Sequence, residues 1–585
     1  MADVSAIASH SQQQFKGSLA ESSIPPTRSC SRTPATMSPP PETKTCGTVS
    51  GGCPDGLVKD EHIDGRGSIE EKEAENGGRR SPQPTLTLLS LSKRIVDCKY
   101  AVRGPIVRRA LQLQKGLKTE PNSFPFKKLI HVNTGDPQGL GQLPISYYRK
   151  VMACVMYPPL MGVPLGYNHL AANESEPDVT ESLSAEERGI AAAASPWFPD
   201  DVMEKSWRYM RAMGSIGAYT HSQGLPLFRQ DIAAWMERRD GIPTNPDNIF
   251  LTDGASSAIR LALELLLRQT NDGVLIPVPQ YPLYAGLVIR MGGLALPYFL
   301  EEETGWSLSI QSIEEAMENA KDRGICVRGL VLINPGNPTG TVLTEEEIRQ
   351  VIDLCRRERL VLLADEVYQD NVYCGLPFIS VRKVLHQMEA SVSVFSFHSS
   401  SKGLVGECGL RGGMVHVDTV DEDVRMEMYK LVSMFMCGNT LGQLAMACIC
   451  SPPKPGDASY EQFQRERQAI YNSMKTKAKL VHDELNKIDG VCCQPIAGSV
   501  FGFPQFVMPP GAFREATRQR VEPDLLFCLE LLEATGIVTV PGSGFGQRRG
   551  TYHVRICILP EEHLLVDMLG KFRDFYKAFV KKYSE

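Results

Sequence analysis

The feature that most limits the fold of this chain is a series of short apolar runs separated by helical patterns. The runs have the length and composition of buried strands and lie at residues 249–252, 274–278, 329–333, 360–364 and 392–397. Apolar residues follow a helical spacing between them, at residues 258–268 and 344–357. Strands that alternate with helices form a mostly parallel sheet covered on both faces, so this order predicts an α/β fold.

A lysine follows the last of these runs. From residue 396 the chain reads Ser-Phe-His-Ser-Ser-Ser-Lys402-Gly, and several glycines and Arg411 come next. A strand that delivers a lysine into a loop of small hydroxyl residues, with an arginine downstream, suits an amine that must reach a bound carbonyl compound beside a phosphate. This is the arrangement of a Schiff-base lysine that holds pyridoxal phosphate. For this stretch alone, the alternative is a surface lysine in a Ser- and Gly-rich turn.

Two upstream motifs also follow buried-strand runs. Residues 334–340 read Asn-Pro-Gly-Asn-Pro-Thr-Gly, and residues 364–368 read Ala-Asp-Glu-Val-Tyr. The second motif places Asp365 at the carboxyl end of a strand, where the ligands of open α/β sheets bind. The motifs around Asp365 and Lys402 therefore favour a ligand site over an ordinary turn.

Three segments carry a family resemblance: residues 364–373, residues 396–413, and the Pro-Gly-Ser-Gly-Phe-Gly stretch at 541–546. They resemble the fold-type I, class I aminotransferases and, in detail, the alanine aminotransferase family, with a similarity that runs from about residue 96 to residue 583. The resemblance implies a large domain with a mostly parallel seven-stranded sheet flanked by helices. A smaller α/β domain built from both chain ends is expected beside it.

The resemblance implies an enzyme that uses pyridoxal 5'-phosphate. Its expected reaction converts L-alanine and 2-oxoglutarate to pyruvate and L-glutamate in a ping-pong sequence, with Lys402 as the catalytic Schiff-base residue and general base. Small amino acids and 2-oxo acids are the expected substrates. Glutamate:glyoxylate transamination or another class I transamination is the alternative.

The same resemblance assigns roles to residues around the cofactor ring. Asp365 is expected to keep the ring nitrogen protonated, because a buried carboxylate favours the charged ring. Tyr368 and Asn337 are expected to hydrogen-bond the phenolic oxygen. Tyr281 is expected to stack on the ring, with one more core aromatic as the alternative.

The phosphate of the cofactor is expected in a cup made by Ser256, Ser399 and Arg411 with the backbone of Ala255. Ser256 lies in the turn predicted at residues 253–257, just before an apolar helix, and backbone N–H groups at a helix N-terminus bind anions. The alternative for this turn is a plain serine N-cap. By resemblance, Tyr219 reaches the cofactor phosphate of a partner subunit, which predicts a homodimer. The alternative for Tyr219 is a turn tyrosine packed on the core.

Three residues are candidates for substrate binding: Arg555, Asn337 and Gly135. Arg555 stands in Tyr-His-Val-Arg-Ile-Cys-Ile and matches the family arginine that binds the α-carboxylate; the alternative is a surface ion pair. Gly135 lies in the Val-Asn-Thr-Gly-Asp-Pro-Gln stretch. The chain departs from the family at residues 498–501, where Gly-Ser-Val-Phe replaces the usual Gly-Ala-Met-Tyr. The hydroxyl lost at Phe501 bears on the choice of substrate side chain.

Two other classes of protein compete with a transaminase. A lyase such as aminocyclopropane-carboxylate synthase shares the lysine, the aspartate and the arginine, but the long matches at 396–413 and 541–546 favour transamination. A cofactor-binding regulator would need a DNA-binding segment, and no basic helix-turn-helix pattern occurs before residue 86.

Composition limits the possible partners. A net charge of −6 provides no broad basic field, so we expect no nucleic-acid partner. The apolar runs are too short to span a bilayer, so we expect a soluble protein without a membrane partner. The 16 cysteines lack the spacing of a zinc ribbon or a disulfide scaffold, which predicts free thiols in a reducing compartment and no metal site.

Composition and the family resemblance together divide the chain into four expected parts. Residues 1–84 are rich in Ser, Pro, Thr and Gly and predict a disordered extension. Residues 85–215 are expected to form an N-terminal arm and part of the small domain, with a surface insertion near 161–196. Residues 216–450 and 451–585 are the expected large cofactor-binding domain and C-terminal small domain. A cytoplasmic location is predicted, with mitochondrial import as the alternative.

Periodicity predicts further elements in the N-terminal and C-terminal parts. Helices are expected at residues 106–117, 421–449, 460–487, 523–535 and 561–583. Strands are expected at residues 500–506, 537–540 and 552–559.

Overall fold

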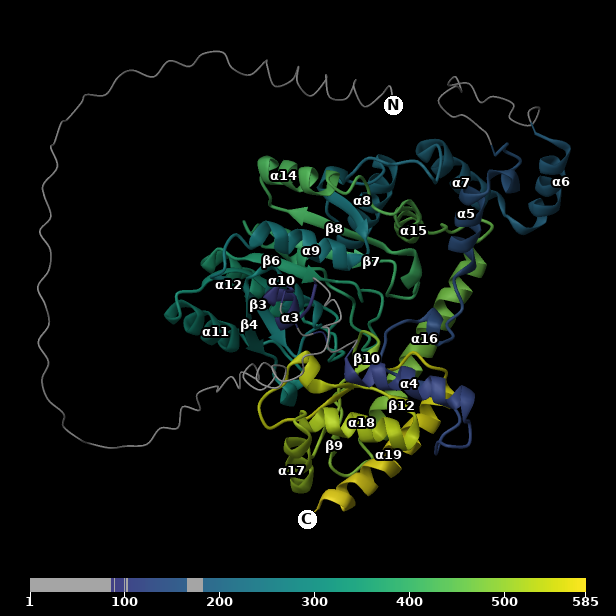
Figure 1. Ribbon diagram of the computed structural model, residues 1–585. Helices are drawn as coiled ribbons and strands as arrows, with labels where there is room; N and C mark the ends of the chain where they lie inside the picture. The colour runs from purple at the N-terminus through teal and green to yellow at the C-terminus, as the bar shows by residue number, and fades with distance from the viewer. Residues whose placement is uncertain (1–85, 89, 99, 101–103, 166–182, 585) are drawn as a thin grey trace, which may run out of the picture. The chain divides into compact units, whose positions relative to one another are not determined.

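A computed structural model describes residues 86–88, 90–98, 100, 104–165 and 183–584 (Figure 1). The described residues belong to one compact unit, residues 84–585. The disorder predicted for residues 1–84 lies outside the described residues. The insertion predicted near 161–196 is described in part, and it contains helix α6 (Ala185–Ala194) with a capping box between Ser184 and Glu187.

A seven-stranded sheet forms the centre of residues 84–585, as predicted. Its strand order is β2-β8-β7-β6-β5-β3-β4, and β8 runs antiparallel to both of its neighbours while the other pairs in the sheet are parallel. The strands are β2 (Ile249–Asp253), β3 (Asp272–Val278), β4 (Leu294–Phe299), β5 (Cys326–Ile333), β6 (Val361–Asp365), β7 (Val394–Ser399) and β8 (Gly412–Asp418). The expected mostly parallel α/β core is confirmed.

Alternate residues of the central strands face two different apolar layers, because successive side chains of a strand point to opposite faces. In β5, Leu330 and Leu332 pack with helices α11, α12 and α13, whereas Val331 and Ile333 pack with α9, α10 and α14. These helices are α9 (Ala255–Leu266), α10 (Leu283–Met291), α11 (Ile310–Asp322), α12 (Glu345–Glu358), α13 (Val381–Gln387) and α14 (Glu422–Ser433). Both faces of the sheet are therefore buried, which explains why its strands are continuous apolar runs.

The carboxyl ends of β6 and β7 lie side by side. Asp365, the last residue of β6, is in register with Ile333 of β5 and Phe397 of β7. Ser399 ends β7 opposite Gly413 of β8. The loop that carries Lys402 therefore leaves the sheet next to Asp365.

A second apolar core joins residues from both ends of the described chain. β1 (Ile130–His131) pairs in parallel with β12 (Ile537–Val538), and α4 (Pro105–Thr119) contacts α18 (Pro523–Thr535) (Figure 1). The other elements of this region are β9 (Val491–Cys492), β10 (Phe501–Gly502), β11 (Gln505–Phe506), β13 (Val540–Pro541), β14 (Val554–Cys557), α16 (Tyr460–Leu485), α17 (Pro510–Gln519) and α19 (Glu562–Tyr583). The expected α/β structure built from both chain ends is present.

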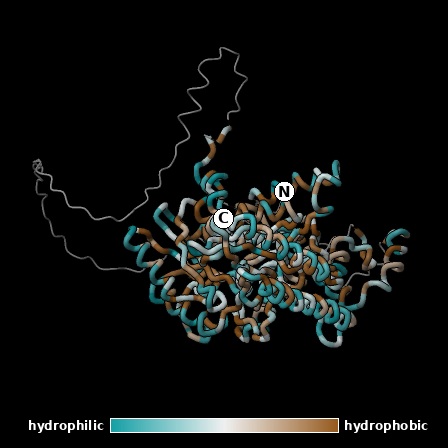
Figure 2. Tube along the Cα trace, turned by 90° about the horizontal axis from the view of Figure 1, so that it is seen from below, coloured by the Kyte–Doolittle hydropathy of each residue, from teal (hydrophilic) through white to brown (hydrophobic). Residues whose placement is uncertain are grey.

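A third apolar cluster lies between β2 and β8 of the sheet and four further helices. These are α5 (Ser146–Met156), α7 (Asp200–Met213), α8 (Pro226–Asp240) and α15 (Thr440–Cys450). Elsewhere, the short helix α3 (Lys93–Asp97) contacts α10. Figure 2 shows hydrophilic and hydrophobic residues alternating along many of the outer helices, as expected where one helix face is buried.

Several predicted elements differ from the observed ones. The helix expected at 421–449 is two helices, α14 and α15, because Met436 adopts a left-handed conformation (φ 68°) and Asn439 caps the start of α15. The strands expected at 500–506 and 537–540 are each two short strands, because their halves pair with different partners. The turn expected at 253–257 is shorter, because α9 already begins at Ala255.

Every cysteine among the described residues is a free thiol, in agreement with the sequence prediction for them. The described residues contain no cluster of His, Cys, Asp and Glu that could hold a metal ion. Among the helices described, none is both long and apolar enough to cross a bilayer.

Candidate active site

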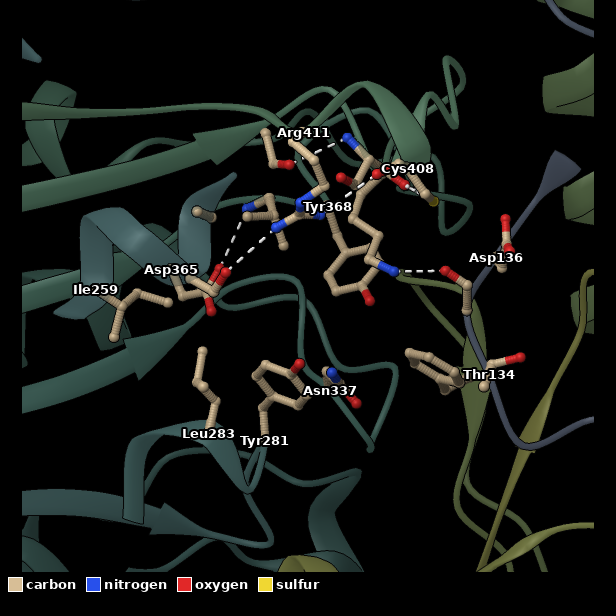
Figure 3. Close-up of a pocket in the computed structure, with 18 of the residues that line it drawn as sticks. Thr134, Asp136, Ile259, Tyr281, Leu283, Asn337, Asp365, Tyr368, Cys408 and Arg411 are labelled. Atoms are coloured by element: carbon tan, nitrogen blue, oxygen red, sulfur yellow. Dashed lines mark hydrogen bonds between the residues drawn. The ribbon is translucent and has the colours of Figure 1, made fainter. Parts of the chain in front are cut away.

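A cavity of about 340 Å³ lies at the carboxyl edge of the sheet, beside the loops that follow β6 and β7 (Figure 3). It brings together every predicted site residue except Tyr219: Gly135, Ala255, Ser256, Tyr281, Asn337, Asp365, Tyr368, Ser399, Lys402, Arg411 and Arg555. These residues come from segments more than 400 positions apart in the chain. The residues predicted at and near the strand ends therefore line one common cavity.

The amine of Lys402 reaches into this cavity. Its Nζ donates a hydrogen bond to the backbone oxygen of Gly135 at 2.5 Å and lies 6.0 Å from the centre of the Tyr368 ring. Burial lowers the pKa of Lys402, and the nearby Arg555 lowers it further. A lowered pKa increases the fraction of neutral amine, which is the form that acts as a nucleophile or a base. The surface-lysine alternative is wrong.

Asp365 is only 4% exposed at the end of β6. Burial raises the pKa of its carboxyl group to about 6, whereas hydrogen bonds and the charge of Lys402 oppose this rise. The Oη of Tyr284 donates to Oδ2 at 2.9 Å, and the backbone N–H of Val367 donates to Oδ1 at 3.4 Å. A carboxylate held in this way favours a cationic partner in the cavity.

The start of α9 forms one wall of the cavity. The N-cap residue is Gly254, so the serine N-cap alternative is wrong, and no side chain caps the helix. Gly254 has a φ of 75°, and a Cβ at this position would lie 2.3 Å from Nη2 of Arg411. Only glycine allows the arginine to approach this closely. The helix therefore presents free backbone N–H groups beside a guanidinium, which is a site for an anion.

Arg411 is fixed by contacts with two loops. Its Nη2 donates to the backbone oxygen of Asp253 at 3.2 Å and to Oγ of Ser256 at 3.4 Å, while Nη1 donates to the backbone oxygen of Cys408 at 3.3 Å. The hydroxyl of Ser399 donates a hydrogen bond to the backbone oxygen of Gly412 at 3.0 Å. Hydroxyl, guanidinium and helix N-terminus thus converge on the same part of the cavity.

Arg555 lies at the opposite end of the site and is 2% exposed. Its Nη1 donates to Oδ1 of Asn337 at 3.2 Å and its Nη2 to the backbone oxygen of Asn133 at 2.6 Å, whereas its Nε has no partner. The guanidinium carbon lies 4.0 Å from the ring centre of Phe501 and 4.6 Å from that of Phe545. Burial lowers its pKa.

The surface ion-pair alternative for Arg555 is wrong, because within the described residues it pairs with no carboxylate. A buried cation without an anionic partner is costly, and it favours the binding of an anion. A substrate carboxylate is such an anion. Phe501 also contacts the neighbouring Gly135 loop, where a Cβ on the glycine would lie 2.8 Å from Cζ of the ring.

The two remaining tyrosines are placed differently. Tyr281 lines the cavity (Figure 3). Its hydroxyl lies 3.1 Å from the hydroxyl of Tyr100. Tyr219 is 77% exposed and lies outside the residues that line the cavity of its own chain. The alternative of a turn tyrosine packed on the core is wrong, and the role of Tyr219 in a partner subunit stays a prediction.

Several residues of the site were not predicted, among them Tyr100, Asp136 and Cys408, which line the cavity, and Tyr284, which donates a hydrogen bond to Asp365. Cys408 and Asp136 stand inside motifs that had been singled out, but nothing in their spacing marked their side chains. Tyr284 had a detectable signal, because it stands three residues after Tyr281, in the first turn of α10. Tyr100 precedes the sheet by more than 100 residues and has no local signal.

Comparison with known proteins gives the same family as the motifs. The family model described as aminotransferase class I and II matches residues 191–566. Alanine aminotransferase 2, mitochondrial, of Arabidopsis thaliana is 43% identical over 504 residues, covering 85% of this chain and 88% of that protein. Glutamate–glyoxylate aminotransferase 2 of the same plant is 40% identical over 502 residues, covering 85% and 97%.

A solved structure agrees with the fold. An alanine aminotransferase from Pyrococcus furiosus matches with a TM-score of 0.62 at 22% identity, covering 83% of this chain and all of that one. With a family model that spans most of the chain, these findings establish that the chain belongs to the class I and II aminotransferases and is an aminotransferase. The resemblance identified from the motifs is confirmed.

Proposed function

We propose that this enzyme is a pyridoxal 5'-phosphate-dependent alanine aminotransferase that converts L-alanine and 2-oxoglutarate to pyruvate and L-glutamate. One observation carries the proposal: the Lys402 amine, with its lowered pKa, lies in one cavity with the buried Asp365 and the unpaired Arg555. The named relatives support the choice of substrates.

The residues present fit this cofactor. The cup of Ser256, Ser399 and Arg411, with the N-terminus of α9 beginning at Ala255, has the donors that a phosphate requires, and Gly254 leaves room for the arginine. Asp365 would hold the ring nitrogen, Tyr281 would stack on the ring, and Asn337 and Tyr368 would bond its phenolic oxygen. When bound, pyridoxal phosphate supplies a protonated ring that accepts the electron pair released at the substrate α-carbon.

Lys402 has two tasks in this reaction. Nζ would hold the cofactor between turnovers, and when released, as a neutral amine, it would accept the proton from the substrate α-carbon. The lowered pKa of Lys402 suits both tasks, because a permanently protonated amine performs neither. Gly135, whose carbonyl oxygen accepts the hydrogen bond from Nζ, keeps the amine at the cavity.

Arg555 orients the substrate. The guanidinium presents a free Nε and is fixed between two rings, so an incoming α-carboxylate meets a donor that loses little freedom on binding. Oδ1 of Asn337 accepts a hydrogen bond from Nη1 of Arg555, and Asn337 would contact the same substrate carboxylate. The Gly135 loop and Phe501 then limit the space around the substrate, which favours a small side chain.

We also propose a homodimer in which Tyr219 contributes to the site of the partner subunit. Its 77% exposure leaves the side chain free for such a contact. The domain boundaries near residues 84, 215 and 450 and a cytoplasmic location are further parts of the proposal. Fluorescence localisation of the full chain, compared with a chain lacking residues 1–84, tests the cytoplasm against mitochondrial import.

Glutamate–glyoxylate transamination is the second candidate. It is favoured by the 40% identical relative of that name and by Phe501, whose ring brings no hydroxyl to the cavity. The two candidates differ in the amino acceptor and donor, and the cofactor residues are the same for both.

The test records the absorbance of the purified protein loaded with pyridoxal phosphate. Addition of L-alanine should remove the band of the lysine-bound cofactor, and 2-oxoglutarate should restore it. A response to glutamate and glyoxylate, without a response to alanine, would favour the second candidate. A protein without this band after addition of pyridoxal phosphate would refute the role of Lys402.

A further inference from the structure

Tyr284 is a buried tyrosine for which the reaction so far assigns no role. It stands in the first turn of α10 and its side chain is 0% exposed. Its Oη lies 2.9 Å from Oδ2 of Asp365, which is the only side-chain hydrogen bond that Asp365 accepts within the described residues. Tyr281 stands three residues earlier and its ring lines the cavity. One short segment therefore provides both a ring in the cavity wall, from Tyr281, and a hydrogen-bond donor to Asp365, from Tyr284.

We propose that Tyr284 is a positioning residue: its hydroxyl fixes Asp365 and stabilises the ionised carboxylate, so that a defined negative charge faces the ring nitrogen of pyridoxal phosphate. This inference rests on the proposed cofactor. The alternative is that the hydroxyl only satisfies its own hydrogen-bonding need in the core.

The surroundings of Asp365 favour an electrostatic role for the hydrogen bond. Burial disfavours the charged carboxylate, whereas each hydrogen bond donated to it stabilises the charge and lowers the pKa of Asp365. Val367 donates from the backbone over a longer distance, 3.4 Å, and Lys402 contributes its charge without a direct hydrogen bond. Burial also raises the pKa of Tyr284 well above its ordinary value, so its hydroxyl stays protonated as a donor.

Tyr298 provides a matched control. It is also a tyrosine buried against the sheet, 1% exposed, and its hydroxyl donates one hydrogen bond of 2.8 Å to the backbone oxygen of Val331. Tyr298 does not line the active-site cavity. Removing either hydroxyl costs one buried hydrogen bond, but only that of Tyr284 contacts Asp365.

The experiment is a double-mutant cycle on cofactor affinity. Apoenzymes of the wild type, Tyr284→Phe, Asp365→Asn and the double variant are titrated with pyridoxal phosphate, and the dissociation constants are measured by tryptophan fluorescence. We expect Tyr284→Phe to weaken binding about tenfold when Asp365 is present and less than twofold in the Asp365→Asn background, because hydrogen bonds to charged groups are the strong ones.

Two further readouts separate positioning from simple loss of packing. Tyr298→Phe should leave the dissociation constant within about twofold of wild type in both backgrounds. In the loaded enzyme, Tyr284→Phe should lower kcat while KM for the amino acid stays unchanged, because Arg555 is untouched. If the Phe variant does not fold, Tyr284→Met, which also lacks the hydroxyl, enters the same cycle.

The outcomes distinguish this inference from the proposed function. An equal loss of affinity in both backgrounds, or no loss at all, would overturn the role of Tyr284 and leave the proposed cofactor intact. A wild-type chain that binds no pyridoxal phosphate would overturn the proposed function and this inference with it.

Discussion

The two ends of the cavity are built from different kinds of structure. At the anion-binding end, Ser399 ends β7, Arg411 directly precedes β8, and Ser256 lies in the first turn of α9, which follows β2. These strands are neighbours, since β2 pairs with β8 and β8 with β7. At the other end, Arg555 contacts Asn337 and Asn133, which are 218 and 422 positions away in the sequence. The first end depends on sheet register, and the second depends on how the region built from both chain ends packs on the sheet.

This difference predicts that the two ends fail separately when they are mutated. Damage to the anion-binding end should reduce cofactor affinity, whereas damage at Arg555 should reduce substrate affinity. Lys402 lies between the two ends and is required by both halves of the proposed reaction.

Lys402→Ala should have the largest effect. Turnover of alanine with 2-oxoglutarate should fall about 10⁴-fold or more, because the variant loses both the covalent anchor and the base. The anion-binding end is unchanged, so pyridoxal phosphate should still bind the variant reversibly in an equilibrium titration. The matched control is Lys430→Ala, which removes a surface lysine paired with Glu427 and should retain wild-type turnover. Turnover above about one hundredth of wild type in the Lys402 variant would contradict its role.

Asp365→Asn should stabilise the apoprotein at high pH. Burial raises the folded-state pKa of Asp365 from 3.8 to about 6, so the stability that this group provides is present below pH 4 and is lost as the pH rises through about 6. At pH 8 the buried carboxylate therefore costs about 3 kcal/mol, which the neutral amide avoids. Urea unfolding of both apoproteins should show a difference at pH 8 that narrows towards pH 5. A difference that is independent of pH would contradict the assignment.

Arg555→Lys should damage only the substrate end. Lysine keeps the charge but loses the planar fork and the contact with the rings of Phe501 and Phe545, so KM for alanine should rise about 30-fold. The dissociation constant of pyridoxal phosphate should stay within about twofold of wild type. A loss of cofactor affinity as large as the rise in KM would show that the two ends are coupled. It would contradict the prediction that they fail separately.

Arg411→Lys is the reciprocal change and should have the smallest effect. A point charge replaces the guanidinium that contacts Asp253, Ser256 and Cys408, so the dissociation constant of pyridoxal phosphate should rise about tenfold. With the cofactor at saturation, KM for alanine should stay near the wild-type value. Steady-state kinetics at several cofactor concentrations separate the two effects.

Much of the fold and part of the site were predictable from local sequence. The helices at 523–535 and 561–583 and five of the seven central strands were found to within a few residues, because their apolar spacing is continuous. No strand was predicted at β4 or β8. The predictions failed at residues 434–439 and at the short strands near 500 and 540, where backbone conformation or pairing partner changes within a few residues. Apolar spacing carries no information about such changes.

The sequence by itself determined the α/β order, the strand ends that carry Asp365 and Lys402, and the identity of eleven of the residues that line the candidate site. Those features depend on patterns within about ten consecutive residues, which the chain encodes directly. Only the tertiary structure decided that Tyr284 contacts Asp365 and that Arg555 is buried between two rings without an anionic partner. Their charge environment depends on burial and on contacts between distant segments, and both are consequences of packing.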